Sequence, residues 1–263
     1  MTVPAQRAVA FRALHNGEPF VIPNPWDIGS ARVLEALGFR TLATTSSGFA
    51  FTLGRHDGAA RLEEVLAHVS ALAGATNVPI SVDLENGHGP TAADVAAAIT
   101  RAANAGAAGG SIEDYTPAAG APYPREVAIE RVAAAVAAAR ALPHDFVLTA
   151  RADGLIRGNP DLDDAIARLV AFEEVGADVL YAPGLRTLEQ VRAVRAATTR
   201  PLNVLARADM TLEQLAEAGV QRISVGGALT WVAAGAMVGA AKRMLDGDFG
   251  GLVVEERADR LLD

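Results

Sequence analysis

The sequence contains no cysteine, and Lys242 is its only lysine. The absence of cysteine excludes disulfides, metal sites built on thiolates and a cysteine nucleophile. Because Lys242 lies far from the end of any expected strand, the sequence also argues against an enzyme that forms a Schiff base with its substrate. Covalent catalysis therefore has few candidate residues.

Long apolar runs and clusters of positive charge are missing as well. No uninterrupted apolar stretch is long enough to span a bilayer, and we expect the apolar segment 228–241 to form a packed helix. The formal net charge is −8 and is spread along the chain, which argues against binding to nucleic acid or to an anionic membrane. No signal-peptide pattern opens the sequence, so we expect a cytoplasmic protein.

Short apolar runs alternate with longer alanine-rich stretches along the chain. Eight runs are typical of strands covered on both faces, and they span Phe20–Pro23, Thr41–Thr45, Pro79–Glu85, Gly109–Glu113, Phe146–Arg151, Asp178–Ala182, Pro201–Leu205 and Arg222–Val225. Helices are expected near 28–37, 60–75, 91–105, 125–142, 161–175, 187–197, 211–218 and 228–245, with a further helix at 4–16.

This alternation predicts a single (β/α)8 TIM barrel over residues 1–263, since such a barrel takes about 250 residues. The alternative is an open, doubly wound sheet. Threonine precedes three of the expected helices, and the phrases EALGF, ANAGA, EEVGAD and AEAGVQ each place a glycine between a helix and the next strand. The charged tail 246–263 is expected to be helical near its end.

Three carboxylates stand where two expected strands end. The active site of such a barrel lies at the carboxyl ends of its strands. Asp83 and Glu85 are two residues apart, so both side chains would point to the same side of a strand, and Glu113 closes the neighbouring strand. Oxygen ligands without histidine or cysteine suit Mg²⁺, or Mn²⁺, better than Zn²⁺. The alternative is that Asp83 and Glu85 form salt bridges or cap the next helix.

A cation and several hydroxyl groups are expected at the same edge. Arg151 closes an apolar strand, and a buried arginine needs an anionic partner, either a protein carboxylate or a substrate. The run TTSSG, which includes Thr45, Ser46, Ser47 and Gly48, offers hydroxyl and N–H groups to an anionic oxygen, or is an ordinary turn. With lysine and cysteine eliminated, a metal ion helped by Arg151 remains the way to stabilise an enolate.

Other residues carry weaker signals. His56 and His88 lie on the functional side of the expected barrel, Trp26 follows the first strand, and Tyr181 stands at the end of the sixth. The turn Ser224–Gly227 after the eighth strand could hold a phosphate, although two glycines also permit a tight turn.

Several motifs in order along the chain resemble the isocitrate lyase/phosphoenolpyruvate mutase superfamily. They read NPWDIGSARVLEALGF, ATTSSGFAFTLGRHDG, SVDLENGHG, GGSIED, LTAR and RISVGGAL, and the resemblance covers roughly residues 20–245. It implies a barrel whose eighth helix is swapped between subunits of a dimer or tetramer, with Mg²⁺ and 2-oxo or enol carboxylate substrates.

The resemblance also implies roles for individual residues. Asp83 would bind Mg²⁺ directly, while Asp57, Glu85 and Glu113 would hold it largely through water. Thr45, Ser46 and Ser47 would bind the substrate carboxylate, and Arg151 would grip the oxygens of the oxo acid. We predict a catalytic set of Arg151, Asp57, Glu113, His88 and Tyr115, and a substrate-binding set of Thr45, Ser46, Ser47, Gly48, Trp26, Asp83, Arg151 and Tyr181.

One segment departs from the superfamily pattern. The lyases that cleave isocitrate or methylisocitrate carry K-x-C-G-H after the fourth strand, and the phosphonate-transforming members use lysine and asparagine there. This chain reads DYTPAAGAPYPRE, and we expect the loop 114–126 to act as a lid. Tyr115, Tyr123 or His88 could supply an acid or base to the leaving fragment.

The residues that remain are those that stabilise an enolate. The sequence therefore predicts a Mg²⁺-dependent C–C lyase or decarboxylase that acts on a small 2-oxo or 2-hydroxy acid, with oxaloacetate-like or methylisocitrate-like substrates. The alternatives are C–P or C–O bond chemistry on phosphonopyruvate-like substrates, a phosphosugar lyase, and a 2-oxo acid-binding protein without catalysis.

Overall fold

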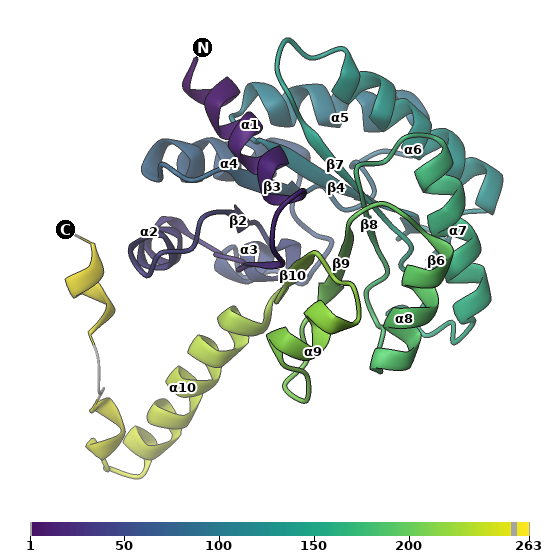
Figure 1. Ribbon diagram of the computed structural model, residues 1–263. Helices are drawn as coiled ribbons and strands as arrows, with labels where there is room; N and C mark the ends of the chain where they lie inside the picture. The colour runs from purple at the N-terminus through teal and green to yellow at the C-terminus, as the bar shows by residue number, and fades with distance from the viewer. Residues whose placement is uncertain (1, 254–256, 263) are drawn as a thin grey trace.

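The computed structural model describes residues 2–253 and 257–262, and it contains a parallel β-barrel surrounded by helices (Figure 1). The eight barrel strands are β1 (Phe20–Ile22), β2 (Leu42–Ala43), β3 (Ile80–Asp83), β4 (Gly109–Glu113), β7 (Val147–Arg151), β8 (Val179–Tyr181), β9 (Leu202–Leu205) and β10 (Arg222–Ser224). Each predicted strand region contains one of them; β4 has the predicted bounds, and the other observed strands are shorter.

The barrel is closed between its first two strands. The ladder runs in the order β1-β10-β9-β8-β7-β4-β3-β2, and every neighbouring pair is parallel. The backbone N–H of Ala43 then donates to the carbonyl of Pro23 at 3.0 Å, which joins β2 to the end of β1. The prediction of a (β/α)8 barrel is confirmed, and the open sheet is excluded.

Most helices lie where the sequence places them. They are α1 (Val3–Leu14), α2 (Ile28–Ala36), α4 (Leu62–Ala75), α5 (Ala92–Asn104), α6 (Arg125–Arg140), α7 (Leu162–Glu174), α8 (Leu188–Ala197), α9 (Leu212–Glu217) and α10 (Ala228–Leu245). Thr91, Thr187 and Thr211 cap α5, α8 and α9 through their side-chain oxygens. The glycines of the four repeated phrases all have φ between 83° and 104°, the left-handed region that lets a helix end.

Helix α1 closes the amino end of the barrel. Its Ala8 and Phe11 are fully buried and pack against Phe20 and Val147, the first residues of β1 and β7. A Cβ on Gly109 would come within 2.6 Å of the Phe11 ring, so only glycine at position 109 allows α1 to pack this closely against β4. Because this end is plugged, the carboxyl ends of the strands form the accessible mouth.

Three segments differ from the expectation. The run after β2 forms an additional helix, α3 (Ser46–Thr52), and the loop after β4 contains a small antiparallel hairpin of β5 (Tyr115–Thr116) and β6 (Ala121–Pro122). In the tail, the described residues form two 3-10 helices, Gly250–Leu252 and Ala258–Leu261; the expected helix extends over residues 254–256 and 263, which lie outside the described part.

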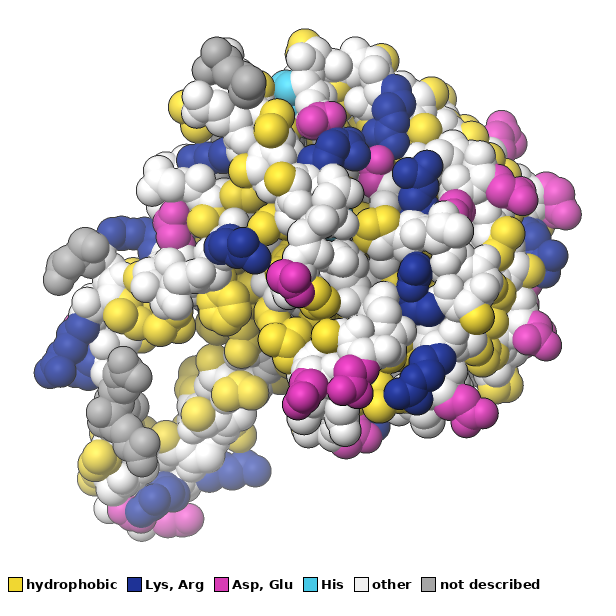
Figure 2. Space-filling view, in the orientation of Figure 1, with side chains coloured by type: hydrophobic (Ala, Val, Ile, Leu, Met, Phe, Trp, Pro, Cys, Tyr) yellow, Lys and Arg dark blue, Asp and Glu magenta, His cyan; other side chains and the backbone are white. Residues whose placement is uncertain are grey.

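The last helix of the barrel, α10, projects away from it (Figure 1). Thr230 is its only buried residue, whereas Trp231, Val232 and Met237 are at least half exposed. Hydrophobic side chains gather where this helix leaves the barrel and continue along it (Figure 2). Among the described residues, no helix combines the length and apolarity needed to cross a membrane.

Candidate active site

A cavity of about 190 Å³ opens at the carboxyl ends of the strands. Its lining includes Thr45, Ser46, Ser47, Asp57, Asp83, Arg151 and Tyr181 from the predicted set. A second cavity of about 200 Å³ shares Ser46, Asp57 and Arg151, and adds Glu85, Glu113 and Tyr115. The structure thus brings ten of the predicted residues to two neighbouring hollows.

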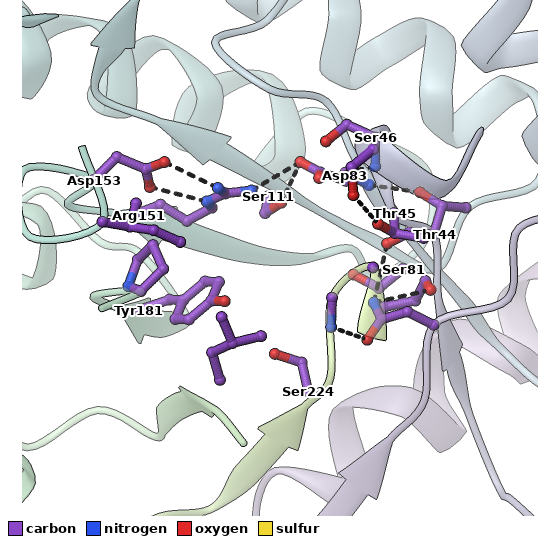
Figure 3. A pocket seen from close by; sticks show the side chains of 18 of the residues that line it. Thr44, Thr45, Ser46, Ser81, Asp83, Ser111, Arg151, Asp153, Tyr181 and Ser224 are labelled. Carbon is purple, nitrogen blue, oxygen red and sulfur yellow. Dashed lines mark hydrogen bonds and ion pairs between the residues drawn. The ribbon is translucent and has the colours of Figure 1, made fainter. Parts of the chain in front are cut away.

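Arg151 stands at the centre of this site (Figure 3). Its guanidinium lies 2.9 Å from Asp83, 2.9 Å from Glu113 and 3.0 Å from Asp153. A second hydrogen bond, from Nε to Asp153 Oδ1 at 3.1 Å, makes the last pairing bidentate and fixes the plane of the guanidinium. These acids raise the pKa of Arg151 although burial opposes the charge, so it is a permanent cation at the cavity wall.

The acids around Arg151 carry more negative charge than the arginine neutralises. Burial, followed by the nearby charges of Asp83 and Asp57, raises the pKa of Glu85 to about 8. Burial likewise raises the pKa of Glu113, against the attraction of Arg151. For Asp83 burial has the same tendency, but the charge of Arg151 and hydrogen bonds from backbone N–H groups lower its pKa. A cation added near Glu85 would therefore be stabilised.

The predicted reason for the position of Glu85, alternation along a strand, is wrong. Strand β3 ends at Asp83, and Glu85 has a φ of 49°, so it is outside the regular strand and the two-residue alternation does not apply. Its side chain still lines the second cavity with Asp57, because the chain turns there. Asp83 forms the salt bridge that was the alternative interpretation, with Arg151, and Glu113 pairs with the same arginine.

The hydroxyl-rich run is the beginning of a helix and not a simple turn. Thr45 caps α3, and its Oγ1 accepts a hydrogen bond from the N–H of Gly48 at 3.4 Å. The N–H of Ser46 points at Asp83 Oδ2, 3.3 Å away. Ser46 and Ser47 line the cavity at the first turn of α3, beside Asp83, which accepts the N–H of Ser46.

Three predicted residues do not line either cavity. A Cβ on Gly48 would meet Thr230 Oγ1 at 2.5 Å, so this glycine allows α3 to pack against α10. The side chain of Trp26 packs beside Gly48, with its Cβ 3.2 Å from the position of that added atom. His88 has a φ of 56° and a buried Nε2 without a hydrogen-bond partner; burial lowers its pKa.

Two arginines at the site were not predicted. Arg157 lies 3.3 Å from Glu113 and 3.7 Å from Asp153, and its guanidinium stacks 4.0 Å from the centre of the Tyr115 ring. Arg222 lines the first cavity from β10. Arg157 belongs to a loop without a recognisable motif, and Arg222 begins a strand, so neither position signalled a site in the sequence.

The first N–H groups of the turn after β10 are not free to bind a phosphate. The N–H groups of Val225 and Gly226 both donate to Asn24 Oδ1 at 2.9 Å. A Cβ on Gly227 would come within 2.6 Å of Ser47 Oγ, so this glycine permits the close approach of α3. The structure supports the alternative interpretation, a tight turn that holds neighbouring elements together.

Comparisons with known proteins agree with this fold. The family model described as phosphoenolpyruvate phosphomutase matches residues 11–245. An oxaloacetate decarboxylase from Bradyrhizobium sp. strain BTAi1 is 32% identical over 86% of this chain and 79% of its own. The crystal structure of a lyase/mutase-type protein from Burkholderia cenocepacia J2315 is 47% identical, with a TM-score of 0.95 over 98% of this chain and 95% of its own.

A further similar structure contains a bound product. Oxaloacetate acetylhydrolase in complex with its product oxalate is 28% identical, with a TM-score of 0.86 over 99% of this chain and 94% of its own. The chain belongs to the phosphoenolpyruvate phosphomutase family, within the isocitrate lyase/phosphoenolpyruvate mutase superfamily, and it is an enzyme of the carbon–carbon lyase type found there.

Proposed function

We propose that this enzyme is a Mg²⁺-dependent C–C lyase or decarboxylase that acts on a small 2-oxo or 2-hydroxy carboxylic acid through an enolate. The observation that carries the proposal is the position of Arg151, a permanent cation fixed by three acids at the wall of a small cavity. Oxaloacetate is the simplest substrate, and two of the related proteins are named for reactions of oxaloacetate.

The residues present fit a magnesium ion held largely through water. In the described part of the chain, no three acidic or histidine side chains are arranged to hold one ion directly. Glu85 is nevertheless a half-buried acid whose pKa is raised first by burial and then by the charges of Asp83 and Asp57, so a cation beside it would favour its charged form. Mg²⁺ keeps several waters and takes few protein ligands, so Asp83, with Asp57, Glu85 and Glu113 beyond the water, suits it. When bound, it would polarise the 2-oxo group.

Side chains of the protein would bind the substrate and stabilise the charge that develops on it. Thr45, Ser46 and Ser47 would hold the substrate carboxylate through hydroxyl groups and the N–H groups at the beginning of α3. The guanidinium of Arg151 would stabilise the negative oxygen that forms when the C–C bond breaks. Burial raises the pKa of Tyr181 to about 12, so its hydroxyl stays protonated and acts as a hydrogen-bond donor and not as a base.

The hairpin β5–β6 supplies the candidate acid for the leaving fragment. Tyr115 lies at its first strand and lines the second cavity together with Glu113 and Arg157. It is therefore nearer to the proposed reaction than His88, which lines neither cavity. A decarboxylase would not need this acid, because CO₂ leaves without a proton.

The decisive experiment measures pyruvate release from oxaloacetate, methylisocitrate and phosphonopyruvate, each with Mg²⁺ and with a chelator. Asp83→Ala is the inactive control, and the non-enzymatic rate with Mg²⁺ alone is subtracted. Mg²⁺-dependent pyruvate from one substrate, lost in the variant, supports the proposal and identifies the leaving group. Reaction of phosphonopyruvate alone would replace it by C–P bond chemistry, and binding without turnover of any substrate would favour a 2-oxo acid-binding protein.

We further propose a cytoplasmic homodimer or homotetramer in which α10 is exchanged between subunits. The support is that α10 leaves its own barrel with an exposed apolar surface that includes Trp231, Val232 and Met237 (Figure 2). Burying such a surface against another subunit is favourable by about 25 cal/mol for each Å² of apolar area.

A further inference from the structure

A second arginine lies inside the barrel, away from the acids that surround Arg151. Cα registers pair Arg151 with Tyr181, Tyr181 with Asn203, and Asn203 with Arg222, across β7, β8, β9 and β10. Residues in register on parallel strands point to the same side of the sheet. Arg222 is therefore the far end of an inward-facing row that begins at Arg151, and both arginines line the same cavity.

The partners of Arg222 are neutral. Its Nε donates to Asn203 Oδ1 at 3.0 Å, and its Nη1 donates to Thr149 Oγ1 at 3.0 Å. Only 4% of the residue is exposed. Over residues 2–253 and 257–262, no carboxylate lies within ion-pair distance of it, in contrast to the three acids around Arg151.

A buried guanidinium without an anion is costly, and buried charges in proteins are usually paired. Burial, together with the charge of Arg151, lowers the pKa of Arg222 to about 10, while Tyr181 opposes the shift. The group therefore still carries its charge at neutral pH. A fold that needed only hydrogen bonds to Asn203 and Thr149 could obtain them from a neutral side chain.

The cavity beside Arg222 offers further hydrogen-bond donors. Ser224 and Tyr181 line it together with Arg222, and the amide of Asn203 donates to Ser224 Oγ at 3.0 Å. No aspartate or glutamate of the described chain lines the cavity apart from Asp57, Asp83 and Asp153, which face Arg151 or the mouth. The part of the cavity at Arg222 thus has donors and a positive charge, and it lacks an anion.

We infer that Arg222 binds a second carboxylate of the substrate, so that the substrate is a 2-oxo or 2-hydroxy dicarboxylate gripped at both ends. This inference rests on the proposed function for the first end, where Arg151 and the beginning of α3 hold the oxo-acid group. A single guanidinium with neutral hydroxyl neighbours matches the single charge of a carboxylate better than the two charges of a phosphonate.

The inference also bears on the bond that breaks. A carboxylate that leaves as CO₂ loses its charge in the transition state, so an ion pair with it would stabilise the substrate more than the transition state. Arg222 therefore suits a carboxylate that the product keeps. This favours a cleavage in which the leaving fragment keeps the carboxylate bound by Arg222. It disfavours a decarboxylation that removes this carboxylate as CO₂.

The test compares the binding of matched 2-oxo acids by calorimetry, with Mg²⁺ present. The pairs are 2-oxobutyrate with oxaloacetate, and 2-oxovalerate with 2-oxoglutarate; members of a pair differ in whether a methyl group or a carboxylate ends the chain. We expect the wild-type enzyme to prefer one of the diacids by on the order of 10- to 100-fold. Arg222→Met should abolish this preference, Arg222→Lys should restore part of it, and the Kd of oxalate should stay within about threefold.

Two results would overturn the inference: no diacid preference in the wild-type enzyme, or the same preference in Arg222→Met. If Arg222→Met weakens the binding of oxalate as much as that of the diacids, Arg222 has a structural role instead. If the variant changes only the binding of phosphonopyruvate, Arg222 binds a phosphonate instead. Circular dichroism confirms that each variant is folded. If diacid binding depends on Arg222 but no substrate is turned over, the proposed function is refuted and this inference stands. If a substrate is turned over but diacid binding does not depend on Arg222, this inference is refuted and the proposed function stands.

Discussion

Replacement of Arg151 by methionine should destabilise the protein markedly. The variant keeps an unbranched, apolar stem but removes the guanidinium, which leaves Asp83, Glu113 and Asp153 without their common partner; their side chains are only 14%, 4% and 0% exposed. Removing one partner of a buried ion pair costs about 3–5 kcal/mol. In a chain of this size, that corresponds to a fall of roughly 6–20 °C in Tm.

Thermal unfolding in a buffer with chelator measures this effect, because a divalent cation would otherwise replace part of the lost charge. Arg157→Met is the matched control: its side chain is 34% exposed, and its ion pairs with Glu113 and Asp153 are longer, at 3.3 and 3.7 Å. Such a partly exposed pair contributes up to about 1 kcal/mol. The reasoning fails if Arg151→Met unfolds within about 2 °C of the wild type, or if both variants lose the same stability.

Three further changes test other parts of the structure. Gly48→Ala should cost about 1–3 kcal/mol in urea unfolding, because its Cβ would meet Thr230; an unchanged midpoint would contradict this packing. Burial lowers the pKa of His15 to about 3, so below about pH 6.5 this histidine takes up a proton in the unfolded state but not in the folded state. The free energy of unfolding should therefore fall by up to about 1.4 kcal/mol per pH unit, and His15→Phe should flatten this decline. Val232→Asp should reduce the mass seen by light scattering if α10 joins subunits, whereas Glu217→Asp should not.

The sequence by itself determined the barrel and most of its boundaries. Threonine caps and left-handed glycines are local signals, since each acts within one turn of its own helix, and the apolar runs between them can only be buried strands. The positions of Asp83, Glu113 and Arg151 followed as well, because a residue that ends a barrel strand must lie at the mouth.

The pairing of side chains was decided only by the tertiary structure. Arg157 meets Glu113 across 44 residues, and Arg222 meets Thr149 across 73, so no local pattern contains these contacts. The turn that carries Glu85 out of β3 depends on its neighbour strand, where the N–H of Glu113 donates to the carbonyl of Glu85 at 2.8 Å. The resemblance to a known superfamily named Asp57, which stands in an exposed loop that the residue pattern alone left unmarked.

Whether an arginine is paired is likewise a tertiary fact. Arg151 ends a short strand and Arg222 begins one, and of the three acids around Arg151 only Asp153 is near it in the sequence. The barrel places the first among three acids and the second among neutral side chains, because strand register brings together residues from distant segments. Charge and hydrogen bonding at the site thus depend on which strands are neighbours, whereas the strands themselves are specified by local sequence.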